Sequence, residues 1–254
     1  MLISFHSIER VIRTEYQHLT KLEPKSIHLW GITLDRSPQC LARCREWLAD
    51  PERERAARFI RERDRNHYVL AHGVLRAVLS RYLGSSPEWV EFDGSETGKP
   101  MLTRKLRDRS EITFNLSHAH GRALVAVSRA QEVGVDLELV RSDVPVENLS
   151  RRFFTQSEYT TIMQSAPEQR AAIFFRYWVA KEAVLKAQGI GLRGLTGCEI
   201  ILGRDGVEKD VRIQVDSRFL DPLRVRLLSC EPGWEAAVAA HNLDRVKQCG
   251  PNTD

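Results

Sequence analysis

Two acidic side chains spaced two residues apart form a pattern that could do chemistry. Residues 134–138 read GVDLE, and a strand here would project Asp136 and Glu138 from the same face. Neighbouring carboxylates repel each other unless a cation lies between them. Oxygen ligands of this kind suit Mg²⁺, which completes its shell with water and a phosphorylated substrate. An exposed acidic strand face is the commoner meaning of such a segment, so both interpretations stay open here.

A third carboxylate and two lysines lie on a segment with helical periodicity. Residues 177–186 read YWVAKEAVLK, and their apolar members recur on one face of a helix. Glu182 and Lys186 lie roughly opposite that face, one turn apart, with Lys181 nearer the flank. An exposed pair with this spacing stabilises a helix by only about 0.2–0.5 kcal/mol. Spacing alone therefore does not separate a functional pair from a surface pair.

A hydroxyl, an imidazole and a lysine lie near predicted turns. Ser117 and His118 are adjacent on a strand, so their side chains diverge and cannot form the contact that a serine–histidine nucleophile pair needs. They could instead hold an anion, although a turn histidine bonded to backbone is the alternative for His118. Lys99, in the GKP turn at 98–100, is expected to be exposed and free to meet a phosphate.

An arginine-rich stretch follows Pro51. Arginines and acids alternate here, which is typical of a solvated helix face with many salt bridges. The same arginines could form an anion site, because guanidinium groups match phosphate oxygens well. The arginines between 51 and 65 are Arg53, Arg55, Arg58, Arg61, Arg63 and Arg65.

The elements that must position these residues can be predicted from periodicity. Residues 27–34 alternate as a strand, and residues 51–82 are expected to form one long helix. Its apolar face includes Phe59 and Ile60; its basic outer face includes Arg58, Arg61, Arg65, His72 and Arg76. Strands are expected at 112–116, around 123–127 and at 132–139, and a helix at 168–188, followed by short strands. Thr155 and Glu158 have the spacing of a capping box.

This order predicts an α+β fold with two similar lobes, related by a pseudo-twofold, and an active site at the lobe interface. The first lobe covers 27–131 and the second covers 132–244, with the join near Gln131. Residues 1–26 are expected to be an N-terminal extension, and residues 245–254 a flexible tail.

Composition limits the class of protein. The chain has 254 residues, 42% of them hydrophobic and 28% charged, and no apolar run approaches the roughly 20 residues of a membrane span. The N-terminus lacks the pattern of a signal peptide, and the five scattered cysteines do not suggest a disulfide framework. We therefore expect a reduced, cytoplasmic protein. A zinc site at Cys40 and Cys44 is a minor alternative, because no second ligand pair stands nearby.

Taken together and in order, five segments resemble the 4′-phosphopantetheinyl transferases, of the larger two-lobed type that acts on acyl and peptidyl carrier proteins. The resemblance runs from about Ile27 to His241. It implies that the phosphopantetheine arm of coenzyme A is moved to a serine hydroxyl of an apo carrier protein, with release of 3′,5′-ADP. The segments are GKP at 98, FNLSH at 114, GVDLE at 134, RFFTQSEY at 152 and WVAKEAVLK at 178.

The resemblance also implies roles for individual residues. It assigns Mg²⁺ to Asp136, Glu138 and Glu182, and it makes Glu182 the candidate base for the incoming serine. Lys186 would contact the pyrophosphate. Glu158 matches a recurrent acid of the family, but its capping-box spacing offers a structural explanation, and the two stay open. The residues expected to bind coenzyme A are Arg53, Arg55, Lys99, Ser117, His118, Lys181 and Lys186.

Two other functions stay open on the sequence. One is a different Mg²⁺-dependent phosphate-cleaving enzyme, such as a nuclease, with the arginine segment as a nucleic-acid track. The acids between those arginines would repel a phosphodiester chain, so no nucleic-acid partner is expected, and no membrane partner either. The other is a non-catalytic module that binds coenzyme A or carrier proteins. Two lobes in one chain would complete the site without a dimer, so we expect a monomer.

Overall fold

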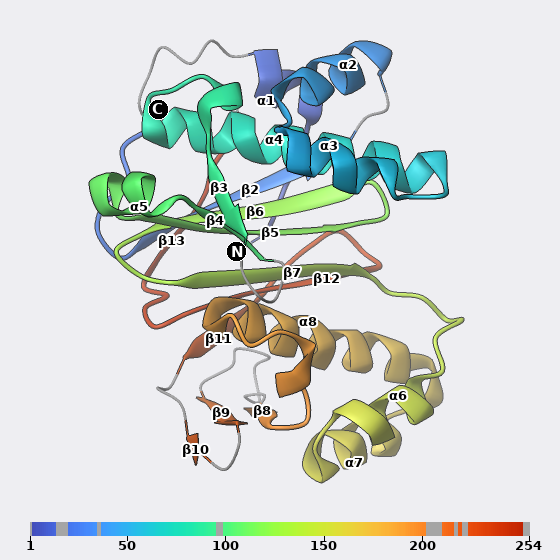
Figure 1. The fold of residues 1–254 in the computed structure, drawn as a ribbon. Helices are drawn as coiled ribbons and strands as arrows, with labels where there is room; N and C mark the ends of the chain where they lie inside the picture. Colours follow the sequence, from blue (N-terminus) through green and yellow to red (C-terminus); the bar gives the residue numbers. More distant parts are fainter. Residues whose placement is uncertain are drawn as a thin grey trace.

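The computed structural model describes residues 2–13, 20–34, 37–94, 99–201, 210–215, 218–219 and 223–250. Two larger sheets lie face to face in the middle of the molecule, and the longest helices cover their outer faces (Figure 1). Each lobe therefore consists of a sheet with a long helix packed on its outside. The predicted α+β fold is confirmed.

The first sheet has the order β1-β2-β6-β5, with β13 also pairing with β2. Strands β5 and β6 form an antiparallel hairpin, and β6 runs antiparallel to β2. Helices α1 to α4 cover its outer face (Figure 1). The bounds are β1 (Phe5–Ser7), β2 (Ser26–Thr33), β5 (Ile112–Ala119), β6 (Arg122–Arg129), β13 (Arg245–Gln248), α1 (Ile8–Arg13), α2 (Pro38–Trp47), α3 (Asp50–Ala57) and α4 (Glu62–Leu83).

Smaller elements connect α4 to β5 within the first lobe. They are a 3-10 turn (Pro87–Trp89), the β3 (Phe92–Gly94) and β4 (Pro100–Leu102) hairpin, and α5 (Arg104–Ser110). Gly98 of the predicted GKP turn lies outside the described residues.

The second sheet has the order β11-β12-β7, and α8 packs along its outer face (Figure 1). A small sheet, β10-β9-β8, lies beyond it. The bounds are β7 (Val133–Leu139), α6 (Val146–Phe153), α7 (Gln156–Gln164), α8 (Arg170–Gln188), β8 (Cys198–Ile201), β9 (Asp210–Val215), β10 (Arg218–Phe219), β11 (Arg224–Leu228) and β12 (Trp234–Ala240), with 3-10 turns at Pro167–Gln169 and Leu192–Gly194. No helix in these described ranges is long and apolar enough to cross a membrane.

Both ends of the chain join the first sheet. Ile3, Ile8 and Val11 are buried, so the described part of the N-terminal segment packs into the lobe core. Strand β13 pairs in parallel with Ser26–Leu29 of β2. The expectation of a flexible tail is therefore wrong for 245–248, whose backbone is held by the sheet ladder.

The arginine-rich segment is two helices rather than the one predicted. Helix α3 ends at Ala57 and α4 begins at Glu62, and Ile60 between them is 99% exposed instead of packing in the core. The predicted basic outer face is also wrong in part. His72 and Arg76 are buried, because a carboxylate on α3 provides their partner.

The two lobes meet along β5 and β7, where side chains complete hydrogen bonds that a sheet ladder would otherwise make. Asn115 Oδ1 accepts the amide of Val135 at 2.9 Å, and Ser117 Oγ accepts the amide of Leu137 at 3.3 Å. Apolar residues from both sheets share one core beside this seam. The FNLSH segment thus fixes the position of β7, which carries the paired carboxylates.

Gly134 sets how closely α8 approaches β7. A Cβ atom at this position would lie 1.9 Å from the carbonyl oxygen of Ala183 and 2.5 Å from the amide nitrogen of Ala187. Both atoms are helix backbone, which has no freedom to move aside. Only glycine therefore lets α8 lie directly against the strand that carries Asp136.

We expect Gly134→Ala to lower the free energy of unfolding by at least about 2 kcal/mol, since an overpacked site must push whole elements apart. Denaturant unfolding measures this. Gly94→Ala is the matched control, because a Cβ at Gly94 meets nothing within 4 Å. Equal stability of the two variants would show that the helix can move away from the strand at little cost.

Candidate active site

Asp136 lies at the centre of a cluster of charged groups between the two lobes. Its side chain is buried, and its Oδ1 atom accepts hydrogen bonds from Ser117 Oγ at 2.8 Å and Lys186 Nζ at 2.6 Å. Its Oδ2 atom is buried and has no hydrogen-bond partner. A buried carboxylate oxygen without a partner is costly, and a cation or hydrogen-bond donor that reached this atom would remove the cost.

Two further carboxylates lie near Asp136 and are destabilised by it. Burial, and then the charge of Asp136, raise the pKa of Glu138 to about 7. The same two causes, in the same order, raise the pKa of Glu182 to about 7. Glu182 Oε1 is a second buried oxygen without a partner. The site therefore has more negative charge than its own lysine neutralises.

Lys186 connects α8 to this cluster. Its ammonium bonds the carboxylate of Asp136 and the carbonyl oxygen of Val135, the latter at 3.2 Å. The structure thus brings Asp136, Glu138, Glu182 and Lys186 together, although they come from a strand and a helix some forty residues apart.

Ser117 has a different partner from the one expected. Its hydroxyl donates to Asp136 and accepts from the Leu137 amide, so it holds the carboxylate in place rather than facing an open anion site. Lys99 was predicted to be free, but the structure gives its ammonium two partners. Its ammonium donates to the carbonyl oxygen of Lys186 at 2.8 Å and lies 3.5 Å from Glu132.

His118 lies near the end of β5, beside basic side chains from both lobes. Its side chain has an accessible edge, but the surrounding protein removes enough water to lower its pKa to about 4, helped by the nearby positive groups His72, Lys186, His67 and Arg55. Arg55 lies over the ring of Tyr68, 5.8 Å from its centroid. Cationic groups gathered around an accessible imidazole are suited to bind an anion.

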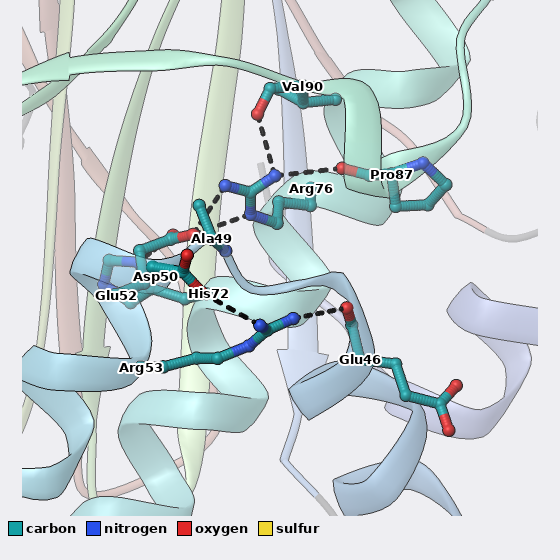
Figure 2. A network of polar contacts seen from close by, with 9 residues as sticks. All are labelled: Glu46, Ala49, Asp50, Glu52, Arg53, His72, Arg76, Pro87 and Val90. Carbon is teal, nitrogen blue, oxygen red and sulfur yellow. Dashed lines mark hydrogen bonds and ion pairs between the residues drawn. The ribbon is translucent and has the colours of Figure 1, made fainter.

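Glu52 holds α3 in place (Figure 2). Its Oε2 atom accepts from the Ala49 amide at 3.0 Å and from two nitrogens of Arg76 at 2.8 and 2.5 Å, while Oε1 lies 3.0 Å from His72 Nδ1. Burial alone would raise the pKa of Glu52, but the hydrogen bonds from His72 and Arg76 outweigh it and keep that pKa below its usual value.

Arg53 faces away from this cluster. It donates to Asp50 at 3.1 Å and to the carbonyl oxygen of Glu46 at 3.1 Å (Figure 2). It also lines a groove of about 630 Å³ between α2, α3 and α4, on another side of α3 from Arg55. Arg53 and Arg55 therefore face different sides of α3, since residues two apart on a helix point in different directions. The expected binding of coenzyme A by Arg53 stays a prediction.

Lys181 does not belong to the site, which corrects its expected contact with coenzyme A. Its side chain is fully buried, and its ammonium lies 2.7 Å from Glu158 and donates to the carbonyl of Leu195 at 2.9 Å. Glu158 in turn caps α7 through Thr155 and accepts the Ile200 amide at 2.8 Å. The capping box is confirmed, and this pair fastens α7, α8 and β8 together.

Sequence reasoning missed Asn115, Glu52 and His72 as residues that support the site. Asn115 carried a signal, because a buried strand position with an amide side chain needs a partner. No sequence signal marked Glu52 and His72, because their contact depends on the break between α3 and α4. Of the cysteine pair, Cys44 packs against Gly73. Burial, and then the effect of Cys40, raise the pKa of the Cys44 thiol to about 12.

A carboxylate cluster of this kind, with lysines and an anion-binding edge between two lobes, is typical of enzymes that act on phosphate groups. Comparisons with known proteins make the class specific. Residues 35–131 match the N-terminal 4′-phosphopantetheinyl transferase family, and residues 132–235 match the 4′-phosphopantetheinyl transferase superfamily.

Similar proteins span both lobes. The chain is 40% identical to 4′-phosphopantetheinyl transferase HetI of Nostoc over 176 residues, which covers 69% of this chain and 74% of HetI. It is 27% identical to 4′-phosphopantetheinyl transferase Sfp of Bacillus subtilis over 220 residues, covering 85% of this chain and 93% of Sfp. The chain belongs to the 4′-phosphopantetheinyl transferase superfamily and is a transferase enzyme. The resemblance seen in the sequence is confirmed.

We expect Lys181→Met to lower the free energy of unfolding by about 3–5 kcal/mol, because it leaves Glu158 buried and unpaired. Adding Glu158→Gln should recover part of this loss, since no buried charge then remains. Chemical denaturation of both variants measures the difference. Glu147→Gln, which breaks an exposed ion pair with Arg151, is the control and should change little. Wild-type stability in Lys181→Met would contradict the structural role.

The raised pKa values of Glu138 and Glu182 predict how stability depends on pH without metal. Each pKa rises from 4.5 unfolded to about 7 folded, so the folded state binds more protons between these values. Their stabilising contribution is fully present below about pH 4.5 and is lost as the pH rises through about 7. Glu182→Gln should therefore lose less stability as the pH rises, and its melting temperature at pH 8 in EDTA should exceed that of the wild type.

Thermal melts across this pH range measure the effect. Glu54→Gln, at an exposed position of α3, is the control and should follow wild type. A Glu182→Gln variant with the wild-type pH dependence would show that Glu182 ionises without repulsion.

Proposed function

We propose that the protein transfers the 4′-phosphopantetheine group of coenzyme A to a serine hydroxyl of an apo carrier protein, giving the holo carrier protein and 3′,5′-ADP. One observation carries the proposal. Asp136 and Glu182 repel each other beside Lys186, and each has a buried oxygen without a partner. Within a chain of this superfamily, such a site suits a cation and the pyrophosphate of coenzyme A.

The residues present fit a bound Mg²⁺ ion. The donor set of Asp136, Glu138 and Glu182 is entirely oxygen, and the mutual repulsion of these carboxylates favours a cation between them. Among the described residues, no three acidic, histidine or cysteine side chains already form a metal cluster. The three carboxylates need not converge before Mg²⁺ binds, because the ion also retains waters and takes oxygens from substrate phosphates. Mg²⁺ bound here would neutralise pyrophosphate charge and stabilise the leaving phosphate.

The reaction forms one P–O bond and breaks another. The carrier serine oxygen bonds to the phosphorus atom that carries the pantetheine arm. The bond from this phosphorus to the bridging oxygen breaks, and its electron pair leaves with 3′,5′-ADP. We assign Glu182 to take the proton of the serine, since a carboxylate within reach of the attacking hydroxyl can act as a general base. Lys186 is placed to balance the charge that develops on the phosphate oxygens.

The nucleotide end of coenzyme A fits the basic side chains around His118. Arg55 and His118 lie on this side, and Lys186 joins it to the carboxylate cluster. His118 is uncharged at neutral pH and surrounded by positive groups, so it can donate a hydrogen bond to a phosphate whose charge those groups balance. We therefore assign Arg55 and His118 to the 3′-phosphate, and Lys186 to the pyrophosphate.

The intact mass of an apo carrier protein tests the reaction. Incubated with the enzyme, coenzyme A and Mg²⁺, the carrier should gain the mass of one phosphopantetheine group, and EDTA should prevent the gain. Asp136→Ala should slow the transfer at least about 100-fold, because it removes a metal ligand and the partner of Lys186. Asp108→Ala, in an exposed ion pair on α5, is the matched control and should transfer at the wild-type rate.

Two results would contradict the proposal. Wild-type activity of a folded Asp136→Ala variant would remove Asp136 from the site. Coenzyme A binding without mass gain on several carriers would instead favour a non-catalytic binding module. Circular dichroism of each variant confirms that the fold is retained.

A further inference from the structure

Lys99 crosses from one lobe to the other at the edge of the site. It lies directly before β4 in the first lobe, and its side chain is only 13% exposed. Its ammonium donates to the main-chain carbonyl of Lys186, on α8 of the second lobe, at 2.8 Å. Glu132, at the start of the second lobe, lies 3.5 Å away and holds the same ammonium.

The carbonyl that Lys99 binds belongs to the last turn of α8. Carbonyl groups there lack partners within the helix, and together they form the negative end of the helix dipole. The Gly189 amide also donates to the Lys186 carbonyl, but at 3.3 Å, and Ile190 donates to Leu185. A buried ammonium at this point completes the end of the helix and fixes it to the first lobe.

The same residue of α8 that Lys99 holds by its backbone reaches the site with its side chain. Lys186 Nζ bonds Asp136 at 2.6 Å, and Asp136 bonds Ser117 of β5 at 2.8 Å. These contacts lead from the first lobe to the second through Lys99 and back to the first through Ser117. The position of the Lys186 ammonium therefore depends on Lys99, which touches none of the carboxylates expected to hold the metal.

We infer that Lys99 is a positioning residue: it acts on coenzyme A through Lys186, and not by contacting a phosphate of coenzyme A itself. The coenzyme A part of this inference rests on the proposed function. The lock on the end of α8 does not, because it concerns the chain alone. The two parts can therefore be tested by separate measurements.

A double-mutant cycle on coenzyme A affinity, read by calorimetry, tests how Lys99 acts. Lys99→Met should raise the dissociation constant of coenzyme A at least about threefold in the wild-type background, and less than about twofold in the Lys186→Met background. Dephospho-coenzyme A should be weakened by the same factor as coenzyme A. Lys105→Met, at an exposed position of α5 in the same lobe, is the matched control and should leave both affinities unchanged.

Hydrogen exchange without ligand tests the lock itself. Lys99→Met should speed exchange of the Gly189 and Ile190 amides at least about fivefold, because their acceptor carbonyls lie in the turn that Lys99 holds. Lys105→Met should not. Glu132→Gln keeps the bond from Lys99 to Lys186 and should change exchange less than Lys99→Met does.

Each other outcome counts against the inference. Additive losses of affinity, or a loss confined to coenzyme A and absent for dephospho-coenzyme A, would show direct contact with a phosphate. Unchanged affinity in Lys99→Met together with faster exchange would show a purely structural residue. Unchanged exchange would show that the lock does not exist. Failure of the wild type to modify any carrier would contradict the proposed function, but the hydrogen-exchange result could still be interpreted.

Discussion

The approach of α8 to β7 at Gly134 is the constraint on which the rest of the site depends. With no side chain at that position, the helix backbone lies against the strand, and Glu182 and Lys186 come within reach of Asp136. A larger residue would move the helix outward and separate the charges that make the site. Gly134 therefore acts through packing: it allows the close approach that brings the charged side chains of α8 to Asp136.

The charges gathered by this packing are only partly balanced. Lys186 neutralises Asp136, but Glu138 and Glu182 remain close enough to resist ionisation, and two carboxylate oxygens have no partner. This arrangement costs stability in the free protein, and a bound cation and phosphorylated ligand would relieve it. Polar groups on the seam share this pattern, since Asn115 and Ser117 of one lobe satisfy the edge strand of the other. Strain and binding capacity therefore occur at the same place.

Local patterns were sufficient to predict the elements that matter most. Alternation placed β5, β6 and β7, helical periodicity placed α8, and Thr155 with Glu158 marked the start of α7. Strand geometry predicted that Asp136 and Glu138 project from one face, but only the family resemblance joined Glu182 of α8 to them. The family resemblance added their order along the chain, which periodicity does not address.

Long-range contacts could not be predicted in the same way. The break between α3 and α4 has no proline or glycine to mark it, so Ile60 was expected in the core and Arg76 in solvent. Lys181 looked like a surface lysine of the site, yet its buried partner, Glu158, lies 23 positions earlier on another helix. Lys99 was expected to be free for the same reason: its acceptor is a backbone carbonyl in the other lobe.

The most direct test of the central claim is a crystal structure of the enzyme with coenzyme A and Mn²⁺, in which anomalous scattering locates the metal. The account predicts one metal ion bound by oxygens of Asp136, Glu138 and Glu182, with the pyrophosphate beside it. It also predicts that the Lys186 ammonium leaves its 2.6 Å contact with Asp136 for a phosphate oxygen. Coenzyme A bound away from the seam, or a metal held by other residues while Lys186 stays on Asp136, would contradict the account.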